Sequence, residues 1–279
     1  MSLSLTKAFT YVKKDPKWSG KILVGGILPL IPSIISTAFQ LLEKSNSTAM
    51  AGIFLVLIML LALMIIAITT GCLVSGYYVK NIKERIDSND ENLPLPEWKN
   101  LWQIFILGLK YNVGYFLYCI PLILVFIFIF LVTIPSAKEN PLLVIPGILV
   151  AIIITILALY FLPVMTVSFV KDLNVFSFVN YVRGANLLQN NLKNYITLIL
   201  YIFLTGITVV AIVMLPFMLL SLLPILLIPS GMSNLAVIFG VLMVALTVFS
   251  SFVQFYAMMV YSDLLAQFGK TKKVSTEIN

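Results

Sequence analysis

Long runs of apolar residues, separated by short polar segments, dominate the pattern of this chain. Six stretches contain no Asp, Glu, Lys or Arg: 22–42, 49–79, 111–134, 141–170, 195–220 and 235–261. A helix of about 20 apolar residues crosses the hydrocarbon core of a bilayer, whereas a spanning barrel strand alternates in polarity and needs only about ten residues. The pattern therefore predicts an all-α integral membrane fold with six transmembrane helices.

Composition supports this prediction and excludes several classes of function. Apolar residues make up 61% of the chain and charged residues 10%, whereas soluble domains carry about 25% charged residues. The chain has no histidine, which is the commonest metal ligand and the commonest general base at neutral pH. We therefore expect a protein that is not an enzyme, without catalytic, cofactor-binding or metal-ligating residues and without a cofactor.

The basic residues predict the orientation of the six spans. Sixteen Lys and Arg residues fall before the first span, after the sixth, or in the second and fourth connections, while the other connections hold only Lys44 and Lys138. The positive-inside rule then puts both termini in the cytoplasm, and we expect the plasma membrane as the location. Asn46 begins a glycosylation acceptor pattern on the predicted outer side, and its occupancy stays open.

The same charges predict the partners. Basic residues beside a membrane attract anionic headgroups, at about 1 kcal/mol each, so the basic balance of the chain requires no nucleic acid. We expect membrane lipids as partners and, as a further hypothesis, another membrane protein.

Polar residues recur at a fixed spacing and divide the chain into three tandem two-helix units. The pairs Lys80-Asn81, Lys171-Asp172 and Ser262-Asp263 follow the second, fourth and sixth spans, 91 residues apart both times. We predict one integral membrane domain over 1–279, with repeats at about 1–92, 93–174 and 175–268 and a polar tail at 269–279.

Each predicted unit begins with an amphipathic segment on the cytoplasmic side. Apolar residues recur three or four positions apart in each segment: Leu5, Phe9 and Val12; Trp98, Leu101, Trp102, Phe105 and Leu109; Phe178, Val182, Ala185, Leu188 and Leu192. Helices with this pattern and a basic polar face usually lie in the headgroup plane. They are interpreted as anchoring elbows or, alternatively, as regulatory elements that sense lipid.

Polar residues and prolines within the spans define a candidate substrate path. Its members are Thr69, Ser75, Pro163, Thr166, Thr247, Ser251 and Gln254. Hydroxyls in spans usually serve helix packing, and prolines usually produce static kinks. The alternative is a conduit of hydroxyls and released backbone carbonyls, as in broken-helix transporters.

Two short motifs carry a resemblance to a known family. Gly76-Tyr77-Tyr78-Val79-Lys80-Asn81-Ile82 is followed by Leu95-Pro96-Glu97-Trp98-Lys99-Asn100-Leu101 and Gly108-Leu109-Lys110. This stretch resembles the family called domain of unknown function 4013, whose members are polytopic prokaryotic membrane proteins. The resemblance implies a location in the cytoplasmic membrane and supplies no catalytic residues.

Two functions remain open at this point. The first is an accessory or scaffold subunit that acts through lipid or protein contacts. The second is a transporter or channel for an uncharged or lipid-like substrate. A core filled by large apolar side chains favours the first function, and a cavity lined by hydroxyls and carbonyls favours the second.

Overall fold

The computed structural model describes residues 3–43, 49–88, 90, 93–139, 144–227 and 233–270, and its regular structure over these residues is entirely helical. The helices are α1 (Leu5–Lys14), α2 (Trp18–Ile27), α3 (Leu30–Glu43), α4 (Ala49–Asp87), α5 (Leu101–Glu139), α6 (Val144–Asp172), the 3-10 turn η2 (Val175–Phe178), α7 (Tyr181–Gln189), α8 (Leu192–Leu227) and α9 (Ser233–Lys270). The all-α prediction is confirmed. Asn46 and the tail from 271 onward lie outside the described residues.

The predicted number of spans agrees with the helices when one bent pair is counted as a single span. Five helices are long and apolar enough to cross a membrane: Val56–Asp87, Leu101–Leu131, Ile145–Asp172, Leu192–Leu220 and Phe239–Lys270. Trp18–Ile27 and Leu30–Thr37 meet the same criterion together, with a bend of 43° between them. The described chain thus has five spans, or six with the bent pair.

Two prolines explain the bend between α2 and α3. Pro29 and Pro32 have no N–H to donate to the carbonyls of Gly25 and Leu28, so two consecutive turns lack a helical hydrogen bond. Ile31 N–H bonds to the carbonyl of Leu28 at 3.3 Å, in the tighter spacing of a turn. The two prolines thus interrupt the first predicted span, and the helical segment starts earlier than predicted, at Trp18.

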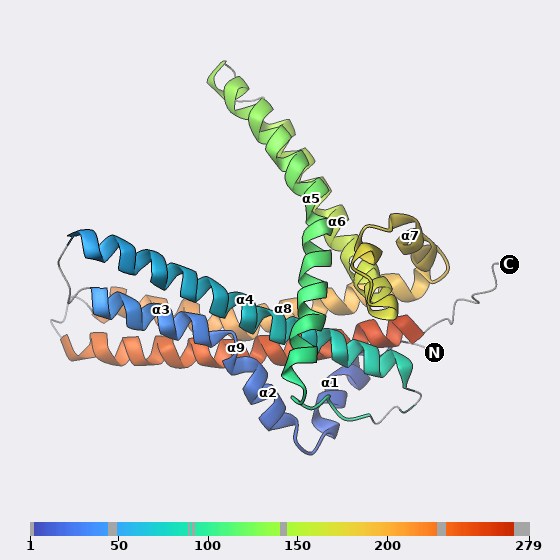
Figure 1. Cartoon of the computed structure of the whole chain (residues 1–279), viewed down its shortest axis with the longest axis horizontal. Coiled ribbons are helices and arrows are strands. Elements are labelled where there is room, and N and C mark those ends of the chain that lie inside the picture. The colour runs from blue at the N-terminus through green and yellow to red at the C-terminus, as the bar shows by residue number, and fades with distance from the viewer. Residues whose placement is uncertain are drawn as a thin grey trace.

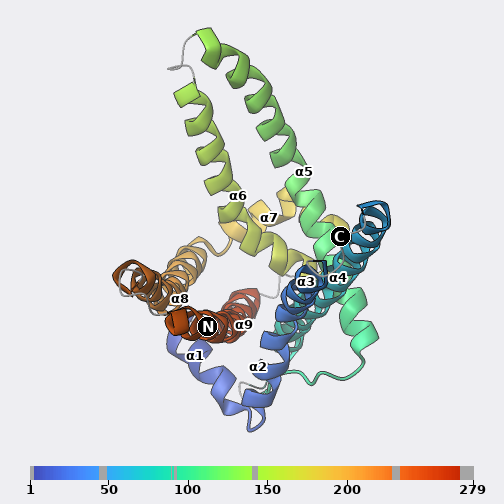
Figure 2. The ribbon, with the colours of Figure 1, turned by 90° about the vertical axis from the view of Figure 1, so that its left-hand side faces the viewer.

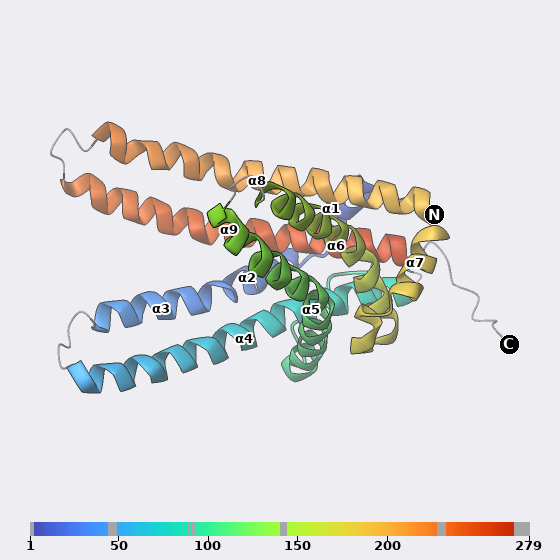
Figure 3. The same ribbon diagram turned by 90° about the horizontal axis from the view of Figure 1, so that it is seen from above.

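The helices form three hairpins that meet at one end, which we call the basal end and which carries α1, η2 and α7. The hairpins α3–α4 and α8–α9 extend to the left in Figure 1, whereas α5–α6 extends upward, away from the other two. Figures 2 and 3 show the same arrangement from two other sides. Contacts between hairpins are made mainly by α4 with α5, α4 with α9 and α2 with α9.

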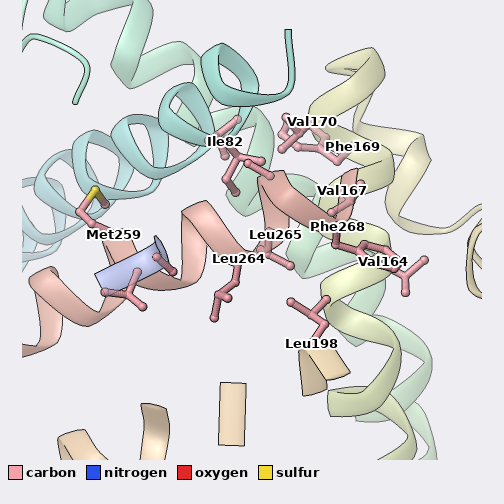
Figure 4. Close-up of a cluster of buried hydrophobic side chains, with 14 of the residues drawn as sticks. Ile82, Val164, Val167, Phe169, Val170, Leu198, Met259, Leu264, Leu265 and Phe268 are labelled. Carbon is pink, nitrogen blue, oxygen red and sulfur yellow. The ribbon is translucent and has the colours of Figure 1, made fainter. Parts of the chain in front are cut away.

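The buried core lies at the basal end and not along the hairpins. Side chains from α4, α6, α8 and α9 pack together in Figure 4, among them Ile82, Val164, Val167, Leu198, Met259, Leu264 and Phe268. Away from the base, the hairpins expose large apolar side chains such as Phe128 (68% exposed) and Val244 (65%). Such exposure fits a surface solvated by lipid.

The three predicted amphipathic segments have different structures. Helix α1 packs its apolar side on α9, with Val12 completely buried. The second segment is not a separate helix, because α5 runs without a break from Leu101, and Trp102 on it is 72% exposed. The third segment divides between η2 and α7, where Phe178 is buried and Val182 is 73% exposed. A position in the headgroup plane stays a prediction for all three.

Candidate functional site

Polar side chains of α1, α4 and α9, together with the backbone of Ser4, form one largely buried cluster at the basal end, which we call the basal network. Its members are Ser4, Tyr11, Asn81, Arg85, Ser262, Asp263 and Gln267. Asn81 and Arg85 lie one turn apart on α4, and Asp263 and Gln267 lie one turn apart on α9, so each pair lies on one side of its helix. The network therefore joins α4 to α9, the last helix of the described chain.

Asp263 is the centre of this network and is completely buried. Its Oδ1 accepts hydrogen bonds from Arg85 Nε at 2.9 Å and from Arg85 Nη2, and its Oδ2 accepts one from Gln267 Nε2 at 2.7 Å. The guanidinium carbon of Arg85 lies 4.0 Å from the centre of the Tyr11 ring, a cation–π distance. A lone buried carboxylate is strongly unfavourable, and these contacts compensate it.

Asn81 connects all three helices of the network. Its Oδ1 accepts a hydrogen bond from Tyr11 Oη at 2.7 Å, and its Nδ2 donates to Ser262 Oγ at 2.5 Å. Burial raises the pKa of Tyr11 and outweighs the nearby Arg85 guanidinium, which lowers it, so the phenol keeps the proton that it donates. The polar pairs of the first and third predicted units are thus in direct contact.

Helix α1 packs over the network and is held on α9 by hydrogen bonds. The N–H of Ser4 donates to Gln267 Oε1 at 2.9 Å, and Gln267 Nε2 donates to the carbonyl of Ser4 at 3.3 Å. Tyr256 Oη donates to the carbonyl of Phe9 at 2.9 Å. These bonds fix α1 on α9 at its N-terminal end and at its middle.

A second polar cluster, around Asp15, joins the segment before α2 to the segment before α5. Asp15 is 2% exposed, and its Oδ2 accepts hydrogen bonds from Lys21 Nζ at 2.6 Å and from the N–H of Leu95 at 3.0 Å. Its Oδ1 accepts one from the N–H of Lys17 at 2.7 Å. Burial raises the pKa of Asp15, but these hydrogen bonds and the charge of Lys21 outweigh it, so the pKa lies below its usual value.

The residues that carry the family resemblance make contacts beside this cluster. Tyr77 Oη donates to the carbonyl of Pro96 at 2.7 Å, and its ring stacks on Trp98 with the centres 4.1 Å apart. Trp98 Nε1 donates to the carbonyl of Lys21 at 3.1 Å. The two aromatic motif residues therefore hold α4, α2 and the loop before α5 together.

Two glycines of the same motifs let α4 and α5 touch backbone to backbone. A Cβ added at Gly76 would lie 1.8 Å from the carbonyl oxygen of Ile104, and a Cβ added at Gly108 would lie 1.8 Å from that of Cys72. Small residues at a crossing are the usual means by which helices in a membrane approach closely. This crossing brings the middle hairpin against the base.

Three residues of the candidate substrate path lie on the outer surface of their helices. Thr69, Thr247 and Gln254 are exposed. The hydroxyls of Thr69 and Thr247 donate to carbonyls of their own helices, at 2.8 Å and 2.9 Å. The structure does not bring these three side chains together with the buried members of the path.

The other four predicted path residues are buried or half-buried. Ser251 Oγ donates to the carbonyl of Gly26 at 2.6 Å, near the break between α2 and α3, and Ser75 Oγ donates to its own helix and lies 3.1 Å from Asn112 Oδ1. Pro163 lies inside α6 and Thr166 is 2% exposed one turn further along. The role of these residues in a path stays a prediction.

The chemistry available at the base is ion pairing and hydrogen bonding between helices. Over the described residues, Ser168 Oγ is the single buried side-chain nitrogen or oxygen without a hydrogen-bond partner. No group of three or more His, Cys, Asp and Glu side chains there could hold a metal ion. The polar groups of the basal network are thus used within the protein itself.

Sequence reasoning missed the ion pair at the centre of the network. The spacing of 91 residues identified Ser262-Asp263 and Asn81, but nothing in the pattern indicated that Arg85 and Asp263 meet. An acidic residue two positions beyond an uncharged span, with Gln267 one turn later, was the available signal. Helix α9 stays buried through Phe268, well past the predicted end of the span at 261.

The long apolar helices, and the hydrogen-bonded polar side chains gathered at the basal end, define a multi-pass membrane protein. The sequence model of the family described as "Protein of unknown function (DUF4013)" matches residues 59–218, more than half of the chain, and the chain belongs to this family. It is also similar to the "Uncharacterized protein MJ1189" of Methanocaldococcus jannaschii, with 26% identity over 286 residues that cover 96% of this chain and 95% of the relative. No solved structure matches the chain.

Proposed function

We propose that this protein is a non-enzymatic accessory or scaffold subunit that acts through contacts of its hairpins with lipid or with another membrane protein. The observation that carries this proposal is a difference between the two parts of the fold. The polar groups at the base are hydrogen-bonded within the protein, whereas the hairpins leave most of their apolar side chains exposed. Only 11% to 22% of the residues in the most apolar window of each straight span are buried. A protein that works by contact needs such a fixed base and a large free surface.

The proposal includes a location in the plasma membrane with both termini in the cytoplasm. The excess of Lys and Arg in alternate connections supports this orientation. It also includes the three tandem units, which the 91-residue spacing supports, together with the contact of Asn81 with Ser262. In this arrangement the basal end faces the cytoplasm.

Photo-crosslinking in cells tests the contact function. A photoreactive residue at Phe128, which is 68% exposed on α5, is expected to give an adduct with one defined membrane protein. The same residue at Phe169, which is completely buried, is the matched control and is expected to give none. Adducts of Phe128 with lipid alone, combined with solute flux in liposomes, would contradict the proposal.

A transporter for an uncharged or lipid-like substrate is the second candidate. The bend of 43° between α2 and α3, with Ser251 on the Gly26 carbonyl beside it, is the observation that favours it, because broken helices form substrate sites in transporters. This candidate predicts flux in liposomes that falls when Thr166 or Gln254 is replaced by an apolar residue. Flux that both substitutions leave unchanged would count against it.

A further inference from the structure

Lys171 is a half-buried cation at the basal end of α6, and the described part of the chain supplies no ion-pair partner for it. It is the last but one residue of the span Ile145–Asp172 and follows seven buried residues, 164–170. Its ammonium group makes no ion pair or hydrogen bond with the part of the chain that the structure describes. Because a cation partly removed from water without an anion is unfavourable, this position calls for a negative ligand.

A second cation is linked to Lys171 through the next residue of the chain. Arg183 on α7 pairs with Asp172, which directly follows Lys171. Its Nη1 and Nη2 bind the carboxylate of Asp172, the latter at 3.0 Å, and this pair is more than one third exposed on both sides. Two cations and one carboxylate leave the site with one excess positive charge and with an arginine that a ligand can reach.

Large apolar side chains are exposed close to Arg183 in the sequence. Phe176 on η2 is 68% exposed, and Val182 and Tyr181 on α7 are 73% and 44% exposed. They belong to the segment that carries Arg183. A small soluble anion would gain nothing from these side chains, whereas a phospholipid presents a phosphate and acyl chains at the same level of the membrane.

We propose that Lys171 and Arg183 form a binding site for the phosphate of an anionic phospholipid, with its acyl chains against Phe176 and Val182. Asp172 competes with the phosphate for Arg183 in this arrangement. The site requires that the chain lies in a membrane, but it does not depend on whether the protein is a scaffold or a transporter.

Native mass spectrometry of the full chain in detergent tests the site, with phosphatidylglycerol and phosphatidylcholine as the probes. Lys171→Met is expected to weaken retention of phosphatidylglycerol about tenfold, as for the loss of one charge-assisted hydrogen bond. Asp172→Asn is expected to strengthen retention, because it frees Arg183. Lys13→Met, which removes the same charge from the exposed side of α1, is the matched control and should change nothing.

Several results would overturn the proposal. Lys171→Met could retain phosphatidylglycerol as the unmodified protein does, or Lys13→Met could lose as much, which would indicate a general attraction of charge. Displacement of phosphatidylglycerol by inorganic phosphate at equal concentration would indicate a site for a free anion. If Lys171→Met does not give a monodisperse protein, Asp172→Asn decides alone, and weaker retention in that variant refutes the site.

Discussion

The pair of Arg85 and Asp263 gives the most direct test of how the base is held together. In Arg85→Met the carboxylate of Asp263, which is completely buried, loses the two hydrogen bonds from the guanidinium; among the described residues, Gln267 remains as its side-chain donor. Breaking a buried ion pair by removing one partner costs about 3–5 kcal/mol. Methionine fills a volume similar to that of the arginine stem, so the substitution leaves the packing largely intact. We therefore expect the free energy of unfolding to fall by about this amount, because the Asp263 carboxylate stays buried without its counter-charge.

The structure offers a matched control in the second arginine–aspartate pair. Arg183 also binds its aspartate through two guanidinium nitrogens, one on each oxygen of Asp172, but their side chains are 38% and 37% exposed, against 9% and 0% for Arg85 and Asp263. Exposed pairs contribute about 0–1 kcal/mol, so Arg183→Met should lower the free energy of unfolding by no more than that. The double change Arg85→Met with Asp263→Leu should recover most of the loss, because it removes both buried charges.

Reversible unfolding in mixtures of dodecyl maltoside and sodium dodecyl sulfate, followed by tryptophan fluorescence, measures all three variants. Arg85→Met is expected to be the least stable of them. A difference of less than about 1 kcal/mol between Arg85→Met and Arg183→Met, or a double variant that is less stable than Arg85→Met alone, would refute this role of the buried ion pair.

Three further predictions concern the helix crossing, the cluster around Asp15 and the orientation in the membrane. Gly108→Ala should lower the free energy of unfolding by about 1–3 kcal/mol, whereas Gly71→Ala, whose added Cβ meets nothing within 4 Å, should not; equal losses in the same unfolding assay would contradict the backbone contact. The lowered pKa of Asp15 stabilises the fold above the usual aspartate value of about 3.9, and this contribution is lost as the pH falls through the lower folded value. Asp15→Asn should therefore flatten the loss of thermal stability on acidification, and an unchanged pH profile would refute this assignment. A cysteine at Asp87, in a cysteine-free background, should resist a membrane-impermeant maleimide in intact cells and react after lysis; labelling from outside would reverse the orientation.

The spans were predictable because their signal is local. An uninterrupted apolar run can be solvated only by lipid or by a core, and this chain is too poor in charge to cover a core. Proline likewise acts on its own turn, so the bend next to Pro29 has a local cause. The motif residues Tyr77 and Trp98 could be selected, but their stacking on each other could not, because a loop of unpredictable course separates them.

The surroundings of an apolar stripe were not predictable from its period. Val12 and Trp102 belong to stripes of the same helical spacing, yet Val12 is completely buried against α9 and Trp102 is 72% exposed. A helical period of apolar residues shows which face of the helix is apolar. It does not show whether lipid or protein covers that face, because both are apolar surroundings. The same ambiguity applies to Thr69 and Ser251, whose hydroxyls the sequence does not distinguish. Thr69 lies on the outer surface of its helix, whereas Ser251 on α9 donates to the carbonyl of Gly26 beside the break between α2 and α3.

The separation of the network residues along the chain implies an order of assembly. Arg85 and Asn81 find their partners 178 and 181 residues later, and Ser4 finds Gln267 263 residues later, whereas each hairpin brings together helices that are neighbours in sequence. Helices in a membrane are individually stable once inserted and associate afterwards. The hairpins can therefore form as the chain enters the membrane, but the base closes only when α9 has arrived. Before α9 is inserted, Asp263 is not yet available to Arg85. The ion pair therefore forms only in the completed base and is absent from a chain whose synthesis has not reached α9.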